Sequence, residues 1–310
     1  MPYGHAPPRI QAKTFAAMGS PCEIQVYALE SEVDIAHVIQ EVIADIQRLE
    51  SRYSRYRPDS LLSQINQIAS VGGRIDVDEE TASLLDYANT CFQQSNGLFD
   101  ITSGLLRQAW RFEKHQLPST HLIDDLLTRI GWEKLIWQRP SLTFTMPGME
   151  LDFGGIVKEY AADRAAGHCQ HLGIQHGIIN LGGDIRVIGP HPNGTPWRIG
   201  IRHPRSPGQI LEIVSLYQGG LTSSGDYERC LVIDGRRYSH ILNPKTGQPV
   251  QNLASVSVIA DFCVLAGSAS TIAMLMEQQG PDWLNQLGLP HIWMDVDGNV
   301  GGPLSEKGSQ

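Results

Sequence analysis

The sequence lacks several features that assign a protein to a class at once. No stretch of its 310 residues approaches the run of about 20 apolar residues that a membrane-spanning helix needs. No block of lysine and arginine occurs, and the formal net charge of -9 argues against a nucleic-acid-binding surface. The nucleotide-binding patterns G-x-x-x-x-G-K-[ST] and G-x-G-x-x-G are also absent. A membrane protein, a nucleic-acid binder and the two common nucleotide-binding folds are therefore not expected.

Cysteine is scarce, and the five cysteines share no metal-binding spacing. They are Cys22, Cys91, Cys169, Cys230 and Cys263. An odd number of widely separated thiols fits free cysteines in a reducing compartment. Residues 1–13 contain neither the apolar core of a signal peptide nor a lipobox cysteine. We therefore expect a cytoplasmic protein as the sequence stands, and the alternative is a periplasmic protein from which the leader was trimmed.

Hydrophobic periodicity predicts an α+β chain rather than a regular βαβ winding. Helical spacing predicts helices over residues 31–49 (capped by Ser31), 80–93, 157–172 and 264–278. Alternation predicts strands over residues 22–28, 177–181, 197–202, 211–217, 230–233, 236–241 and 254–260. Asp234-Gly235 and Asp297-Gly298 are hairpin turns. We expect one domain over residues 10–303, with loose termini at 1–9 and 304–310.

The most informative segment runs from Leu151 to Asp184. It reads L-D-F-G-G-I-V-K-E-Y-A-A-D and, after a spacer, N-L-G-G-D. Asp152, a glycine pair and Lys158 stand at the entry of a predicted helix. Glycines let a ligand approach the backbone, a helix N-terminus attracts anions, and the lysine adds a full positive charge. The segment therefore predicts a phosphate or pyrophosphate site.

Five further polar or glycine-rich motifs flank the predicted strands and helices. They are M-G-S from Met18, S-R-Y-R-P-D-S from Ser54, F-D-I-T-S-G from Phe99, T-S-S-G-D-Y from Thr222 and S-H-I-L-N-P-K-T-G-Q-P from Ser239. With the two motifs above, and in this order, they resemble the ApbE family of FAD:protein FMN transferases. The resemblance extends from Phe15 to Met276. Each motif alone is weak, but the ordered set is specific.

The resemblance implies an ApbE-like fold of two interlocked lobes around a central flavin cleft. It also implies a Mg²⁺-assisted reaction that cleaves FAD at its pyrophosphate. FMN passes through its phosphate to a threonine hydroxyl of an acceptor flavoprotein, a subunit of a redox complex, and forms a phosphoester. The chain's own D-I-T-S-G from Asp100 does not match the acceptor motif, so self-flavinylation is not expected.

Carried over by motif, the resemblance also implies the residues of the site. The cofactor-binding residues are Met18, Tyr56, Leu98, Phe99, Asp100, Asp152, Lys158, Gly182, Gly183, Asp184, Ser223, Ser224, His240 and Ile241. Lys158 lies near the phosphates, and His240 is the base that takes the proton of the acceptor threonine. Each assignment has a structural alternative, such as a solvated Lys158, a histidine that is structural or exposed, or Asp152 as a helix cap.

The metal site departs from the family pattern. The family motif A-D-A-x-x-T supplies an aspartate and a threonine to magnesium, and the carbonyl of Gly155 faces the metal. This chain reads A-G-S-A-S-T, so Thr271 is present but Gly267 replaces the aspartate. Mg²⁺ usually takes one or two carboxylates, and Asp184 or Asp226 could provide one from another loop.

The missing aspartate leaves two other functions open. One is an FAD-binding protein without transferase activity, such as a carrier or regulator. The other is hydrolysis of FAD to FMN and AMP, with water as the acceptor. Replacing Gly267 by aspartate is expected to switch on transfer in a parent that lacks it.

Overall fold

The chain divides into two compact units, each made of segments far apart in the sequence. The computed structural model describes residues 8–29, 33–114 and 116–305. Unit 1 consists of Met1–Glu50, Val157–Ser223 and Ser257–Gly267. Unit 2 consists of Ser51–Ile156, Ser224–Val256 and Ser268–Gln310. The prediction of one domain over residues 10–303 stays a prediction.

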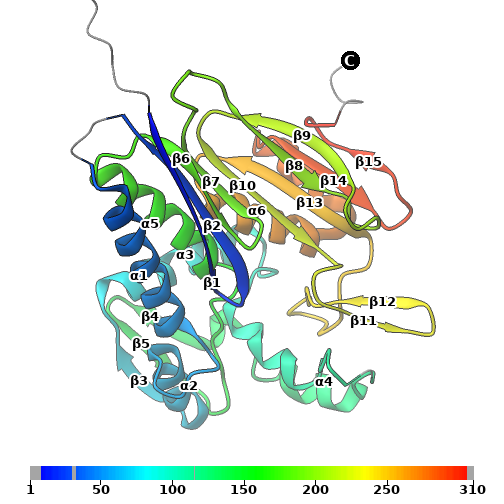
Figure 1. Cartoon of the computed structure of the whole chain (residues 1–310). Coiled ribbons are helices and arrows are strands. Elements are labelled where there is room, and N and C mark those ends of the chain that lie inside the picture. Colours follow the sequence, from blue (N-terminus) through cyan, green and yellow to red (C-terminus); the bar gives the residue numbers. More distant parts are fainter. Residues whose placement is uncertain (1–7, 30–32, 115, 306–310) are drawn as a thin grey trace, which may run out of the picture. The chain divides into compact units, whose positions relative to one another are not determined.

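Unit 1 is built on a β-sheet with the strand order β1-β2-β6-β7-β10-β13 (Figure 1). These strands are β1 (Arg9–Ala17), β2 (Ser20–Ala28), β6 (His176–Leu181), β7 (Asp184–Gly189), β10 (Gly219–Gly225) and β13 (Leu253–Ala260), of which the last two extend into unit 2. Neighbouring strands from β1 to β10 are antiparallel. A separate hairpin pairs β8 (Trp197–Arg202) with β9 (Ile210–Leu216).

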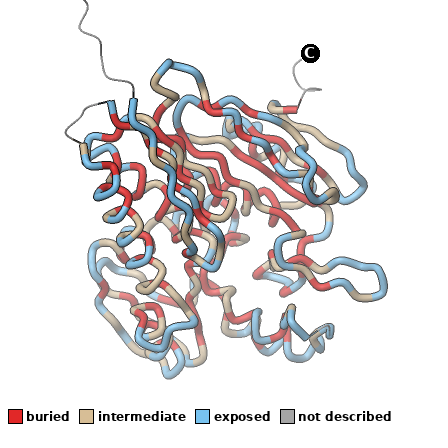
Figure 2. Tube along the Cα trace, in the orientation of Figure 1, coloured by how far each residue is buried: buried red, intermediate tan, exposed pale blue. Residues whose placement is uncertain are grey.

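Helix α5 (Val157–His171) packs on β6 and β7 and places the predicted phosphate lysine. Most of its buried residues are small, including Ala161, Ala162, Ala165 and Ala166, so the helix can approach the sheet closely. Helix α1 (Ile35–Tyr53) alternates buried and exposed positions along its length (Figure 2). Arg164 of α5 donates from Nε to Asp45 Oδ2 of α1 at 2.9 Å. These contacts fix α5 against β6, β7 and α1.

Unit 2 combines short strands with most of the helices. Its strands form β3 (Gly73–Asp76), β5 (Ser141–Phe144) and β4 (Leu135–Gln138) in one sheet, the hairpin β11 (Cys230–Ile233) with β12 (Arg236–Ser239), and β14 (His291–Asp295) with β15 (Val300–Gly301). Its helices are α2 (Leu61–Val71), α3 (Glu79–Gln94), α4 (Thr120–Leu127) and α7 (Gly280–Gln286), with 3₁₀ turns η1 (Ile101–Gln108), η2 (Trp132–Lys134) and η3 (Glu277–Gln279). Helix α6 (Cys263–Met276) contributes residues to both units.

The predicted elements are confirmed to within a few residues where their periodicity is strong. The strands over 197–202 and 230–233 coincide with β8 and β11, and the helix over 80–93 is α3. The expected cap Ser31 lies outside the described residues, and Asp34 Oδ1 accepts from the amides of Ala36 and His37 instead. Arg9, expected in a loose terminus, pairs with Ala28 as the first residue of β1.

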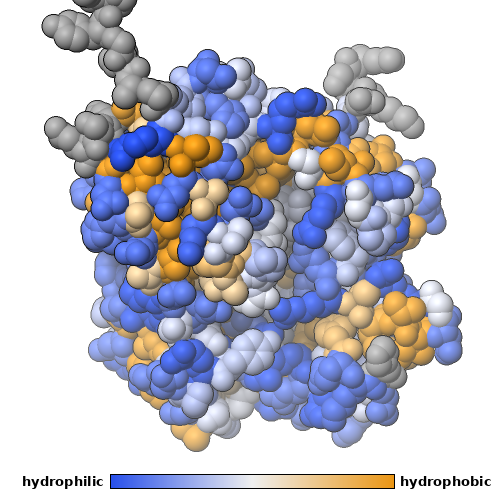
Figure 3. Space-filling model, viewed as in Figure 1, coloured by the Kyte–Doolittle hydropathy of each residue, from blue (hydrophilic) through white to orange (hydrophobic). Residues whose placement is uncertain are grey.

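One face of the molecule can be described by its hydropathy. Hydrophilic residues cover most of the face shown in Figure 3, and hydrophobic ones form scattered patches. In the described part of the chain, no helix combines the length and the apolar character needed to cross a membrane. The five cysteines are free, and only Cys230 is not buried.

Candidate functional site

The predicted site residues fall into two groups. Unit 1 contains Met18, Lys158, Gly182, Gly183, Asp184, Ser223 and Gly267. Unit 2 contains Tyr56, Leu98, Phe99, Asp100, Asp152, Gly155, Ser224, His240, Ile241 and Thr271. Within each unit, residues from motifs far apart in the sequence lie in contact.

Two tight hairpin turns lie next to each other in unit 1. Met18-Gly19 joins β1 to β2, and Gly182-Gly183 joins β6 to β7, all four with positive φ. The amide of Gly182 donates to the carbonyl of Pro21 at 3.1 Å. A Cβ on Gly182 would lie 2.6 Å from Ser20 Cβ and 4.0 Å from Lys158 Nζ, so a side chain has no room there. The turns therefore bring glycine backbone without side chains close to the positive charge of Lys158.

Lys158 and Asp184 form an ion pair within this group. Lys158 Nζ lies 3.0 Å from Asp184 Oδ2. Asp184 is only 3% exposed, whereas the Lys158 side chain is 25% exposed. Lys158 stands in the first turn of α5, where the helix dipole also favours an anion. The motifs L-D-F-G-G-I-V-K and N-L-G-G-D thus meet at this ion pair, and the phosphate site stays a prediction.

A third charged residue, Glu159, belongs to the same group and was not among the predicted ones. Its burial, with the negative charge of Asp184, raises the pKa of Glu159 to about 8, although the Lys158 ammonium lowers it. Oε2 of Glu159 has no hydrogen-bond partner among the described residues. The only sequence signal for this residue is a glutamate in the apolar, inward-facing part of an alanine-rich helix.

The first turn of α6 is attached to α5 by Asp163. The Asp163 carboxylate accepts from the amides of Cys263 at 2.8 Å and Val264 at 2.9 Å. Its Oδ1 also lies 3.1 Å from Nε of Arg186 on β7. Glu159 precedes Asp163 by one helical turn, and Gly267 follows Cys263 by one. The pairing of the two helices therefore aligns Glu159 with Gly267.

In unit 2, Asp152 is held by several elements. Its Oδ2 forms an ion pair with Arg55 Nη1, and its Oδ1 accepts from the amide of Gly154 at 2.9 Å. Its own amide donates to the carbonyl of Ile101 at 2.8 Å. The bond to Gly154 fits the structural alternative, in which Asp152 orders the turn before α5.

Tyr56 is an exposed aromatic ring. The residue is 76% exposed, and its hydroxyl accepts from Arg55 Nη2 at 3.0 Å. The Arg55 guanidinium also lies 5.1 Å from the ring centroid. This hydrogen bond lowers the pKa of Tyr56. A ring presented in this way suits stacking against a flat ligand.

Asp100 is committed to the scaffold of unit 2. It caps η1, and its Oδ1 accepts from the amide and hydroxyl of Thr102 at 2.8 and 2.7 Å. Oδ2 accepts from the amide of Trp132 at 3.0 Å. Burial raises the pKa of Asp100. Beside it, Phe99 packs on Gly155, where a Cβ would lie 3.3 Å from the ring, and Leu98 is half-buried.

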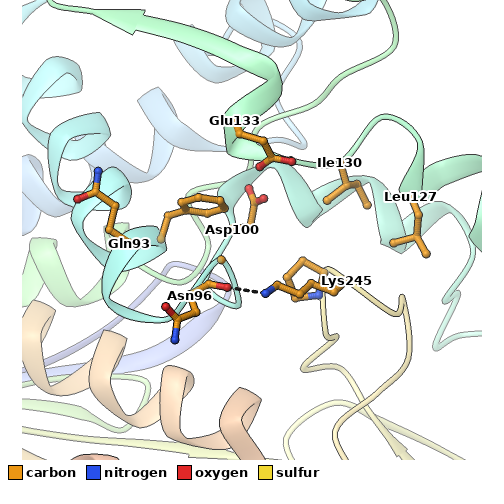
Figure 4. Close-up of a pocket in the computed structure, with 11 residues that line it drawn as sticks. Gln93, Asn96, Asp100, Leu127, Ile130, Glu133 and Lys245 are labelled. Carbon is orange, nitrogen blue, oxygen red and sulfur yellow. Dashed lines mark hydrogen bonds between the residues drawn. The ribbon is translucent and has the colours of Figure 1, made fainter.

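A pocket of about 660 Å³ opens beside Asp100 (Figure 4). It is lined by Asn96, Glu133 and Lys245 together with the apolar side chains of Leu127 and Ile130. Lys245 Nζ donates to the carbonyl of Asn96 at 2.5 Å. The pocket brings the F-D-I-T-S-G motif to the N-P-K-T-G motif, and its size suits a small ligand.

His240 is oriented by one backbone carbonyl. Both its amide, at 3.0 Å, and its Nδ1, at 3.1 Å, contact the carbonyl of Arg229. A carbonyl only accepts, so Nδ1 carries the proton and the lone pair of the neutral ring lies on Nε2. Nε2 is therefore the ring nitrogen that can accept a proton, and the role of His240 as a base stays a prediction. The next residue, Ile241, is buried and donates to Ser239 Oγ at 3.0 Å.

Hydroxyl groups gather along α6 and β10. Ser224 Oγ lies 2.8 Å from Ser270 Oγ and 3.0 Å from Thr271 Oγ1. In unit 1, Ser223 Oγ lies 2.7 Å from Ser257 Oγ. The T-S-S-G-D-Y motif therefore contacts the helix that carries the A-x-x-T remnant.

Comparison with known proteins agrees with these motifs. The family model described as "ApbE family" matches residues 18–293. This chain belongs to the ApbE family. The FAD:protein FMN transferase of Klebsiella pneumoniae is 31% identical over 261 residues, which are 81% of this chain and 78% of that protein. That of Haemophilus influenzae is 29% identical over 243 residues, or 75% and 70%.

Solved structures of ApbE proteins share the fold. The ApbE protein of Thermotoga maritima has a TM-score of 0.86 at 29% identity and covers 96% of this chain and 98% of its own. The flavin transferase ApbE of Vibrio cholerae has a TM-score of 0.86 at 26% identity, covering 97% and 99%. The predicted ApbE-like α+β fold is confirmed. The flavin cleft between two lobes and the roles of single residues stay predictions.

The donors in unit 1 of this ApbE family member fit a magnesium ion. The described residues contain no group of three or more histidine, cysteine, aspartate or glutamate side chains that could hold a metal. Two carboxyl groups, those of Glu159 and Asp184, nevertheless lie together, and Oε2 of Glu159 has no hydrogen-bond partner in the described part of the chain. Mg²⁺ binds through one or two carboxylates and completes its shell with water and substrate phosphates. A small, hard-oxygen donor set is therefore compatible with this ion.

Proposed function

We propose that this chain is an FAD:protein FMN transferase. The observation that carries the proposal is the cradle in unit 1, where Lys158 in the first turn of α5 lies beside Asp184 and the Gly182-Gly183 turn, which contacts Ser20 and Pro21 next to the Met18-Gly19 turn. Glycine-rich backbone, a helix N-terminus and a lysine are the features that commonly bind a pyrophosphate. The curated relatives that this chain matches over most of their length are named for the same activity.

The reaction proposed is an in-line displacement at the phosphorus of the FMN half of FAD. The threonine Oγ of the acceptor forms a P–O bond, the pyrophosphate P–O bond breaks, and AMP leaves with the bridging oxygen. Nε2 of His240 takes the threonine proton, and Lys158 stabilises the negative charge that develops on the phosphates. Asp152 and Tyr56 position FAD, the latter by stacking. A bound Mg²⁺ would neutralise phosphate charge.

The acceptor proposed is a flavoprotein subunit of a redox complex. The relatives' names state a protein substrate and no more. We propose the cytoplasm as the compartment, and cell fractionation with an antibody against the chain tests this.

Transfer is tested by incubating the purified protein with FAD, Mg²⁺ and a flavin-acceptor domain. Covalent flavin fluorescence on the acceptor in a denaturing gel is the expected result, and a threonine-to-alanine acceptor should stay unlabelled. A His240→Ala variant should lose labelling but keep FAD binding. An unlabelled acceptor, with a competent relative labelling it in parallel, contradicts the proposal.

The substitution at Gly267 favours a second function, FAD binding without transfer to protein. The same assay separates the outcomes when its products are resolved by chromatography. FMN and AMP released without acceptor indicate hydrolysis. Intact FAD bound to the protein indicates a carrier or regulator.

A further inference from the structure

Glu159 occupies the space that a side chain at position 267 would need. A Cβ built on Gly267 would lie 2.5 Å from Glu159 Cγ and 2.9 Å from its Oε1. Carbon atoms do not approach so closely, so Glu159 in this position requires a glycine at position 267. The carboxylate missing from α6 is thus replaced in space by a carboxylate from α5.

The direction of Glu159 is fixed by the way the two helices meet. Asp163 holds the amides of Cys263 and Val264, and Glu159 meets α6 one turn further along. Both contacts lie on the same face of α5, because residues four apart are neighbours on a helix. The packing of α5 against α6 therefore places the Glu159 side chain next to position 267.

The Glu159 carboxyl group is buried and has an oxygen atom available to bind a cation. The residue is only 8% exposed, and its Oε2 has no hydrogen-bond partner among the described residues. A buried polar atom without a partner is costly, so such atoms are retained where they have a role. Lys158, whose charge lowers the pKa of Glu159, forms an ion pair with Asp184.

We propose that Glu159 supplies, from α5, the metal-binding carboxylate that the family motif places at position 267 on α6. The inference rests on the proposed function, because the ion in question is the divalent cation of the transfer reaction. Gly267 is then a necessary partner of the relocated ligand and not a sign of lost activity. Asp184, beside Glu159, is the second acidic group of the site.

This assignment changes the expected result of the Gly267→Asp substitution. The new side chain would collide with Glu159, so the single variant should melt at a lower temperature and bind metal no better than the parent. The double variant Glu159→Ala/Gly267→Asp returns one carboxylate to α6 and removes the obstruction. The double variant should regain both the melting temperature and the metal affinity of the parent.

Mn²⁺, whose electron paramagnetic resonance signal reports binding directly, is a suitable probe. It is titrated into the parent, Glu159→Gln, Gly267→Asp and the double variant, with and without FAD. Glu159→Gln keeps the shape and removes the charge, and should weaken Mn²⁺ binding by at least about 10-fold. The exposed Glu23→Gln substitution on β2 is the matched control and should bind as the parent does. Melting curves show which variants are folded.

The outcomes separate this inference from the proposed function. A Glu159→Gln variant that is folded and binds Mn²⁺ as tightly as the parent overturns it, as does a parent that binds no Mn²⁺ in either condition. If the protein binds Mn²⁺ in a way that depends on Glu159 but cannot label an acceptor, the inference about Glu159 is supported and the transferase proposal fails. Acceptor labelling that continues with Mg²⁺ in Glu159→Gln sinks the inference and leaves the transferase proposal standing.

Discussion

Two buried carboxylates, Asp100 in unit 2 and Glu159 in unit 1, differ in what surrounds them. Asp100 accepts three hydrogen bonds, from the amide and hydroxyl of Thr102 and the amide of Trp132. Glu159 has an oxygen without a partner among the described residues and faces a second carboxylate. Burial raises the pKa of both. Satisfaction of hydrogen bonds, rather than burial or motif, therefore distinguishes a scaffold carboxylate from one that can bind a ligand.

The largest effect expected on stability is that of Asp100→Ala. The change removes a helix cap and leaves buried donors of Thr102 and Trp132 without an acceptor, at a cost of about 3 kcal/mol. Chemical denaturation measures it. Asp100→Asn keeps one acceptor oxygen and should cost less. A folded Asp100→Asn protein that loses FAD affinity would break the comparison, because Asp100 would then be a cofactor residue as well.

Lys158→Ala should sharpen the contrast, because it should reduce FAD affinity more than it reduces the stability of the fold. Loss of a charge-assisted contact to the pyrophosphate, worth about 1.5–3 kcal/mol, weakens FAD binding by roughly 10- to 100-fold. Removal of the ion pair to Asp184 should lower the melting temperature as well. Calorimetric titration with FAD measures the affinity, and Lys13→Ala on β1 serves as a control outside the cradle. Unchanged affinity would place the pyrophosphate elsewhere.

Met18→Asn should separate stability from binding. Met18 has a φ of 54°, a conformation that asparagine adopts more readily than methionine. The variant should gain up to about 1 kcal/mol in stability. If the methionine contacts FAD, affinity should fall at the same time. A variant that is less stable than the parent would contradict the strain assigned to this turn.

The smallest effect concerns His291, a second buried group with an unpartnered atom. Burial lowers its pKa, Nδ1 contacts the carbonyl of Leu289 at 2.8 Å, and Nε2 has no partner among the described residues. The unfolded chain binds a proton more readily than the folded one. Stability is therefore lost as pH falls through the ordinary histidine pKa of about 6.5.

Urea denaturation of the parent and His291→Gln at neutral and mildly acidic pH measures this loss. The variant should lose less stability on acidification. An equal loss in both proteins would assign the acid sensitivity to other groups.

Sequence motifs predicted the family, the fold class and the elements with clear periodicity, such as β8, β11 and α3. They did not predict β1, because its position depends on pairing with β2, nor the sheet β3-β5-β4, whose strands are only four residues long. Glu159 was missed for a related reason. Its role follows from the docking of α5 on α6, which no local pattern encodes, whereas the absence of an aspartate at position 267 was visible at once.

Helix α6 has a consequence for the order of events in folding. Its first turn contains no acidic residue, and the amides of Cys263 and Val264 are capped by Asp163 from another helix. A helix with an N-cap residue in its own segment can form before it packs against other elements. Helix α6 obtains its cap only when α5 packs against it. Hydrogen exchange at those two amides should therefore report the docking of α5 rather than the formation of α6.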